Sequence, residues 1–192
     1  MTGIAVVILA GGEGRRIGGE KPLRLLAERR LIDRALDLAR RWSSTLAVAV
    51  RDPSQTPSMD AEFIEDEAIE GPLGGLATGL KFARTQGYPL LLTIPADMPF
   101  LPTDLLDRLA ASIGESGCAM ASSGGHSHPV SALWRVSALG QLDDYVSSGT
   151  RSLKGFAALV GAVEVEWASD PDDPFFNINS VADLAEAEKR LR

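Results

Sequence analysis

IAVVILAGGEGRRIGGEK, residues 4–21, joins a short apolar run to a glycine-rich loop. Residues 4–10 are rich in valine and isoleucine, which is typical of a strand buried on both faces. The loop that follows places glycine at positions 11, 12, 14, 18 and 19. Glycines allow backbone N–H groups to converge on an anion, and Arg15, Arg16 and Lys21 add positive charge. Because ligands of open α/β sheets bind beyond the carboxyl ends of strands, this stretch predicts a phosphate site there.

Apolar runs and helical periodicity alternate over the rest of the first half. We expect further strands at residues 46–50, 61–64 and 89–95, and helices at residues 31–42, 73–83 and 102–111. Strands that alternate with helices at this spacing indicate a parallel sheet covered on both faces. The predicted fold is therefore α/β, a three-layer α/β/α, Rossmann-like arrangement with a mostly parallel sheet.

The pattern is looser after residue 112. Residues 122–128, SSGGHSH, are expected to form a flexible polar loop, followed by a strand at 129–135 and a helix at 136–146. A strand at 163–167, an acidic proline-rich loop at 168–174 and a helix at 181–191 complete the chain. We expect the tryptophans at 42, 134 and 167 to belong to the core.

Composition limits the possible functions. The chain has 192 residues, of which 45% are hydrophobic, so one domain over residues 1–192 can bury a substantial core. Its formal net charge of −7 disfavours nucleic acid as a partner. The single cysteine, Cys118, excludes an intramolecular disulfide and a multi-cysteine zinc site. No targeting or membrane-spanning segment is evident, so we expect a soluble cytoplasmic protein without membrane partners.

The loop fits neither of the two common phosphate-binding fingerprints. A P-loop needs Gly-Lys-Ser/Thr, but Lys21 follows Glu20 and precedes Pro22. The dinucleotide pattern G-x-G-x-x-G would need glycine at Ile17. The loop is therefore a third kind of glycine-rich phosphate-binding loop.

Two polar motifs outside the loop suit a metal ion or a phosphate. Asp97 follows the apolar run 89–95, which would deliver its carboxylate to the ligand edge, and carboxylate oxygens suit Mg²⁺. Asn177 and Asn179 are the only asparagines, and an extended backbone would place both on one face. Structural roles remain open alternatives: a turn or N-cap for Asp97, and a cap for the last helix from an asparagine or from Ser180.

The loop and four later motifs together resemble a known family. LAGGEGRRIGGEKP, residues 9–22, resembles the L-A-G-G-x-x-x-R-x-G-x-D/E-K-P signature of nucleotidyltransferases, and specifically of the molybdenum cofactor guanylyltransferases. The resemblance continues in IEDEAIEGPLGGL (64–76), IPADMPFLP (94–102), SHPVSALW (127–134) and FFNINSVADL (175–184). It implies Mg²⁺-dependent transfer of GMP from GTP to the terminal phosphate of molybdopterin, with release of pyrophosphate. It also implies delivery to apo-molybdoenzymes or their chaperones.

The same resemblance assigns roles to individual residues. It implies a nucleotide-binding half at residues 1–111 and an acceptor-side half at 112–192. The nucleotide site would contain Leu9, Ala10, Gly11, Gly12, Gly14, Arg15, Lys21, Asp66, Gly74 and Asp97, with Lys21, Asp97 and Arg16 catalytic. The metal would be held by Asp97 and Asn179, and the acceptor by His128, Arg151, Asn177 and Asn179. The sequence Leu9-Ala10-Gly11-Gly12 favours guanine, because cytosine-specific relatives carry L-A-A-G.

Two other functions remain open. The same fold could transfer a cytidylyl or guanylyl group to another small phosphorylated acceptor, which turnover with CTP or without molybdopterin would reveal. A carrier that binds the nucleotide and delivers the cofactor without catalysis would bind GTP but release no pyrophosphate. For His128 the plain alternative is a loop histidine whose hydrogen bonds are made to the backbone.

Overall fold

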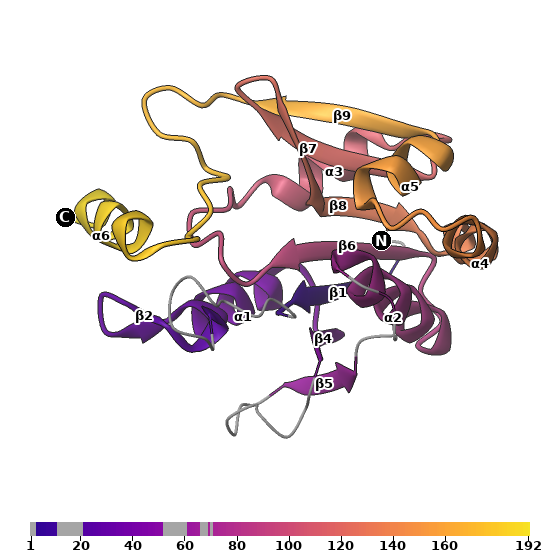
Figure 1. The fold of residues 1–192 in the computed structure, drawn as a ribbon, viewed down its shortest axis with the longest axis horizontal. Coiled ribbons are helices and arrows are strands. Elements are labelled where there is room, and N and C mark those ends of the chain that lie inside the picture. Colours follow the sequence, from indigo (N-terminus) through magenta and orange to yellow (C-terminus); the bar gives the residue numbers. More distant parts are fainter. Residues whose placement is uncertain (1–2, 11–20, 52–60, 66–68, 70) are drawn as a thin grey trace.

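The computed structural model describes residues 3–10, 21–51, 61–65, 69 and 71–192. Its main sheet has seven strands in the order β5-β4-β1-β6-β8-β7-β9 (Figure 1). The strands are β1 (Ile4–Leu9), β4 (Leu46–Val50), β5 (Glu62–Glu65), β6 (Leu90–Pro95), β7 (Cys118–Ser123), β8 (His126–Arg135) and β9 (Ala162–Trp167). Only β8 runs antiparallel to its neighbours, β6 and β7, so the predicted mostly parallel sheet is confirmed.

The central strand β1 shows why the first apolar run forms a strand. Val6 stands in register with Leu46 of β4 on one side and with Leu92 of β6 on the other. The four inner residues of β1 are fully buried. A strand with two strand neighbours and helices on both faces needs apolar side chains in both directions, as this sequence provides.

Helices cover both faces of the sheet, which confirms the three-layer prediction (Figure 1). One face packs against α1 (Leu31–Trp42) and α3 (Leu105–Ser112). The other packs against α2 (Pro72–Thr85), α4 (Leu139–Ser147) and α5 (Leu153–Leu159). The last helix, α6 (Val181–Arg190), contacts a small hairpin formed by β2 (Leu25–Leu26) and β3 (Arg29–Arg30).

Helix α2 approaches the sheet closely because a glycine faces it. A Cβ atom at Gly79 would lie 3.1 Å from Leu91 Cδ2 and 3.4 Å from Val7 Cβ. Such contacts are tighter than is usual for a Cβ atom, so a larger residue at this position would require Leu91 or the helix to shift. This close contact fixes the helix over the middle of the sheet.

The expectation of a flexible loop at residues 122–128 is wrong. Ser122 and Ser123 end β7, His126 begins β8, and only Gly124 and Gly125 form the turn between them. Both glycines have positive φ, 54° and 77°, which is the backbone of a tight two-residue hairpin turn. The polar side chains around Gly-Gly therefore belong to a strand end and not to a loop.

Three smaller differences also lie in the second half. Residues 118–121 belong to β7 and residues 153–159 to α5, neither of which was expected. The helix expected at 136–146 is divided into a 3-10 turn, η4 (Val136–Ala138), and α4.

Among the described residues, no helix has the length and apolar content needed to cross a bilayer.

Candidate functional site

The carboxyl edge of the sheet gathers segments from distant parts of the chain. Strands β1, β6, β7 and β9 end at this edge, and the antiparallel strand β8 begins there. Leu9 and Ala10 are half-buried at the end of β1. The N–H of Ala10 donates to the carbonyl of Ala49 (3.0 Å), and the N–H of Ala96 donates to that of Leu9 (3.2 Å). The backbone itself therefore fixes the start of the glycine-rich loop beside the end of β6.

Asp97 lies two residues beyond the end of β6, as the sequence predicted. Its side chain is half-buried, and the Oδ1 atom of its carboxylate has almost no contact with solvent. Its backbone carbonyl accepts a hydrogen bond from the N–H of Ile178 (3.0 Å). This bond brings the segment that contains both asparagines to the same end of β6.

Ile178 anchors the asparagine segment in the core. It is 1% exposed and packs with Leu26, Leu31 and Ala187, whereas Asn177 is half-buried and Asn179 is exposed. This pattern agrees with the expectation that both asparagines flank an inward-pointing isoleucine. The segment is not part of a strand, and the hydrogen bond from Ile178 and its buried side chain attach it to the end of β6 and to the core.

Ser180, and not an asparagine side chain, caps the last helix. The Ser180 Oγ accepts a hydrogen bond from the N–H of Asp183 (3.1 Å), and the Asp183 Oδ2 accepts one from the N–H of Asn179 (2.8 Å). Ser180 thus satisfies a helix N-terminal donor, and Asp183 accepts a hydrogen bond from the backbone just before the cap. Of the two capping alternatives left open by the sequence, the structure contains the serine one.

The first turn of α2 also reaches this edge. This helix connects the carboxyl end of β5 to the amino end of β6, and the Thr78 hydroxyl donates to the carbonyl of Glu65 (3.0 Å). Gly74 is buried in the first turn, after Gly71 with its positive φ of 76°. The N-terminus of a helix carries partial positive charge and therefore favours a phosphate nearby.

Several expected site residues lie outside the described residues. These are Gly11, Gly12, Gly14, Arg15, Arg16 and Asp66. Lys21 begins the 3-10 turn η2 (Lys21–Leu23), and its side chain also lies outside the described part of the structure. Their roles at the nucleotide site stay predictions.

His128 lies in β8 and its partner is a side chain. Its Nε2 is 2.7 Å from the Oγ of Ser123, and its ring stacks on Phe175 with centroids 4.6 Å apart and planes 10° apart. Burial lowers the pKa of His128, against the opposing influence of the Asp173 and Glu166 carboxylates. The idea of a loop histidine that bonds to the backbone is therefore wrong.

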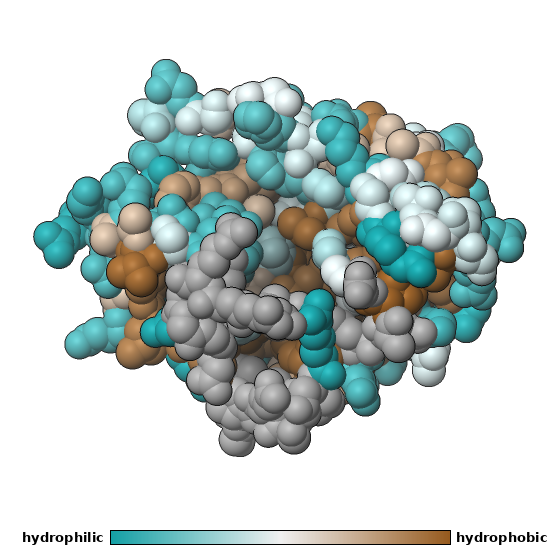
Figure 2. Space-filling view, viewed as in Figure 1, coloured by the Kyte–Doolittle hydropathy of each residue, from teal (hydrophilic) through white to brown (hydrophobic). Residues whose placement is uncertain are grey.

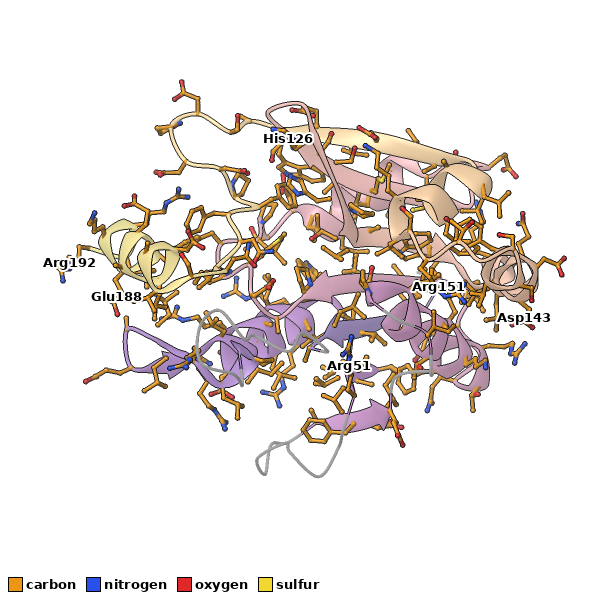
Figure 3. All side chains as sticks on the ribbon, in the orientation of Figure 1. Arg51, His126, Asp143, Arg151, Glu188 and Arg192 are labelled. Atoms are coloured by element: carbon orange, nitrogen blue, oxygen red, sulfur yellow. The ribbon has the colours of Figure 1, made fainter. Side chains whose placement is uncertain are left out.

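Arg151 lies in the connection between α4 and α5 and is exposed. Its Nη1 donates to the carbonyls of Val146 (2.6 Å) and Thr150 (3.0 Å), so the guanidinium covers the C-terminal end of α4. Figure 3 shows Arg151 beside α4, far from His126, which lies at the turn of the β7–β8 hairpin. The structure does not bring Arg151 next to His128.

The tryptophans are core residues, as expected. Trp134 is fully buried and its Nε1 donates to the Thr93 hydroxyl (3.1 Å), while Trp167 is 6% exposed. Trp42 is partly buried against the α1–α3 side of the core, and its Nε1 donates to the carbonyl of Thr103 (3.1 Å). None of the three is presented as an open stacking surface.

Sequence reasoning missed Ser123, Asp173 and Phe175, which surround His128. Ser123 donates to the Asp173 Oδ1 (2.9 Å), and the same oxygen accepts the N–H of Phe175 (2.9 Å). Ser123 and Asp173 are separated by 50 residues, so no local pattern joins them. The Gly-Gly turn was the one available signal, because it places Ser123 opposite His126 at a hairpin end.

The viewed face of the molecule is hollowed near its centre (Figure 2). In the same orientation, Figure 1 places this region between the half with β1 and β6 and the half with β7, β8 and β9.

Within the described ranges, no three His, Cys, Asp or Glu side chains gather as a metal site. A site with one carboxylate and one amide oxygen would leave most ligand positions to phosphates and water, which suits Mg²⁺.

The model of the MobA-like NTP transferase domain matches residues 6–164, which include most of β1 as well as Asp97 and His128. The chain belongs to this family. It is 39% identical over 189 residues to the molybdenum cofactor guanylyltransferase of Cereibacter sphaeroides, covering 97% of this chain and 96% of that protein. The protein of the same name from Rhodobacter capsulatus is 39% identical over 98% of this chain and 97% of its own. Membership of this family makes the chain a nucleotidyltransferase.

Solved structures agree with the fold of the family. The molybdopterin-guanine dinucleotide biosynthesis protein A of Archaeoglobus fulgidus superposes with a TM-score of 0.79 at 24% identity, over 97% of this chain and 98% of that one. The 2-C-methyl-D-erythritol 4-phosphate cytidylyltransferase of Thermus thermophilus gives a TM-score of 0.71 at 19% identity, over 97% and 98%. The nucleotidyltransferase fold is therefore shared between proteins whose names differ in base and acceptor.

Proposed function

We propose that this protein transfers GMP from GTP to the terminal phosphate of molybdopterin that carries molybdenum. An oxygen of that phosphate attacks the α-phosphorus of GTP, a new P–O bond forms, and the bond to the bridging oxygen breaks to release pyrophosphate. The product, molybdopterin guanine dinucleotide, would pass to apo-molybdoenzymes. The observation that supports the proposal is the full-length similarity to molybdenum cofactor guanylyltransferases, in a chain where Ile178, the residue before Asn179, donates a hydrogen bond to the backbone carbonyl of Asp97.

The donor set at this edge fits a hard divalent cation. Asp97 offers a carboxylate with a buried oxygen, and Asn179 follows Ile178, whose N–H donates to the backbone carbonyl of Asp97. We propose that these two residues hold Mg²⁺, since the ion prefers one or two protein oxygens plus phosphates. When bound, Mg²⁺ would neutralise charge on the α-phosphate and on the leaving pyrophosphate, worth several kcal/mol.

Other groups of the chain would bind the triphosphate and the acceptor. Arg15, Arg16 and Lys21 would bind the triphosphate together with the glycine backbone of the loop. The first turn of α2 at Gly74 would add partial positive charge on the same side. Asn177 and His128 would bind the acceptor. Asn177 directly precedes Ile178, which is hydrogen-bonded to Asp97, and His128 stacks on Phe175 in the same segment. Bringing the two phosphates together in a fixed orientation is itself a large part of such catalysis.

Pyrophosphate release from purified protein tests the proposal. The assay contains Mg²⁺ and molybdopterin cofactor, with GTP and CTP in parallel, and EDTA in a control. We expect pyrophosphate release in the reaction with molybdopterin and GTP but not in the reaction with molybdopterin and CTP. EDTA should abolish that release. Release with CTP would overturn the base, release without molybdopterin would overturn the acceptor, and GTP binding without release would favour the carrier.

A further inference from the structure

Three side chains from distant parts of the chain form a continuous hydrogen-bonded line beside the site. Ser123 is 1% exposed at the end of β7, His128 lies in β8, and Asp173 lies in the segment between β9 and α6. The Ser123 hydroxyl donates its single proton to the Asp173 carboxylate (2.9 Å). Ser123 must then accept from His128, so the proton of the neutral ring sits on Nε2.

The same carboxylate holds the segment that leads to the asparagines. The Asp173 Oδ1 also accepts the backbone N–H of Phe175 (2.9 Å). The Phe175 ring is 2% exposed, stacks on His128 and meets Trp167 edge-on with centroids 5.5 Å apart. One aspartate oxygen therefore fastens both the β7–β8 hairpin and the turn at Phe175.

Three residues further on, the segment is fastened again. The N–H of Ile178 donates to the carbonyl of Asp97 at the end of β6 (3.0 Å). Asn177 lies between the two attachment points, and Asn179 follows the second. The backbone that carries Asn177 is therefore held at both ends, by Asp173 through Phe175 and by Asp97 through Ile178.

We propose that Ser123, His128 and Asp173 form a positioning relay that sets Asn177 and Asn179 against Asp97 for the second substrate. This proposal rests on the proposed function, which supplies the second substrate. Ser123 and Asp173 act through the segment 173–179, and His128 adds its stacking on Phe175 to the contact with the acceptor proposed above. A hydrogen bond to a charged group contributes more than one between neutral groups, which makes Asp173 the strongest link.

Kinetics of matched variants test the relay. We expect Ser123→Ala and Asp173→Ala to lower kcat/KM for molybdopterin about tenfold, the size expected for one such bond, while the Kd for GTP stays within about twofold. Asp173→Asn keeps an oxygen acceptor for both donors and should recover most of the loss. Ser127→Ala is the matched control, because Ser127 lies in β8 directly before His128 and donates instead to Glu164.

Hydrogen exchange measured by mass spectrometry gives a readout that needs no turnover. We expect faster exchange in residues 173–179 of Ser123→Ala and Asp173→Ala, and wild-type exchange in Asp173→Asn and Ser127→Ala. Unchanged exchange in both alanine variants, or an equal loss of GTP affinity, would overturn the relay. If the wild-type protein releases no pyrophosphate with molybdopterin, the proposed function fails, and exchange alone decides whether the relay holds the segment.

Discussion

The two sides of the candidate site are held in place by different kinds of bonds. On the side of β1 and β6, parallel strands and their backbone hydrogen bonds place Leu9, Ala10 and the residues that lead to Asp97. On the side of β7 and β8, the segment from Asp173 to Asn179 lies outside the sheet and depends on side chains such as Ser123. A side-chain change should therefore leave the geometry of the first side intact but shift the second.

Substitution of Asp97 should have the largest effect on activity. Asp97→Ala removes the carboxylate proposed to hold the metal, but the hydrogen bond from the Ile178 N–H to the backbone carbonyl at position 97 remains. We expect kcat to fall by about 1,000-fold or more, equivalent to about 4 kcal/mol, with little change in melting temperature. Asp143→Ala, at an exposed position on α4, is the control and should keep wild-type activity (Figure 3). Activity close to wild type in Asp97→Ala would remove Asp97 from the mechanism.

Substitution of Phe175 should instead damage the second side through stability. The ring is buried between His128 and Trp167, so Phe175→Ala removes a large part of that packing. We expect the free energy of unfolding to fall by about 3–5 kcal/mol, measured by urea denaturation. Phe175→Leu keeps most of the volume and should cost less. A loss below about 1 kcal/mol in the alanine variant would mean that the aromatic contacts do not hold the segment.

The first side was predictable from sequence because its strands are buried on both faces. Continuous apolar runs such as residues 4–9 and 90–95 indicate such strands directly. The position of Asp97 follows, because residues after a parallel strand reach the ligand edge of the sheet. No tertiary information was needed for this part of the site.

The second side was harder because its strands carry polar residues and its contacts are distant in sequence. Ser122, Ser123 and His126 are polar yet belong to a hairpin, so hydrophobicity alone indicated a loop. The bond between Ser123 and Asp173 joins residues 50 positions apart, and only the paired strands β7 and β9 bring them together. Family resemblance named His128 but could not supply its partners.

Removal of a helix cap should have a smaller effect that is confined to the second side. Ser180→Ala leaves the N–H of Asp183 without its acceptor at the start of α6. We expect a loss of about 1 kcal/mol in the free energy of unfolding, measured by thermal or urea denaturation. Ser180→Thr keeps the hydroxyl and should restore most of it. Equal stability of the alanine variant and the wild type would contradict the capping role.

The pH dependence of stability should reveal the smallest difference, through His128. Burial lowers its pKa in the folded protein, although Asp173 and Glu166 oppose this and His126 adds to it. Between the usual value of 6.5 and the lowered one, the unfolded chain binds more protons, so stability falls as pH falls. His128→Gln removes that proton uptake.

Denaturation of wild type and His128→Gln from pH 8 to pH 5 measures the effect. Above pH 7 both forms have a neutral side chain at this position, so the difference in their unfolding free energies should stay constant. Below about pH 6.5 the wild type should lose stability relative to the variant, and the loss should level off below the folded-state pKa. A constant difference over the whole range would mean that burial of the ring beside Phe175 does not penalise its charged form.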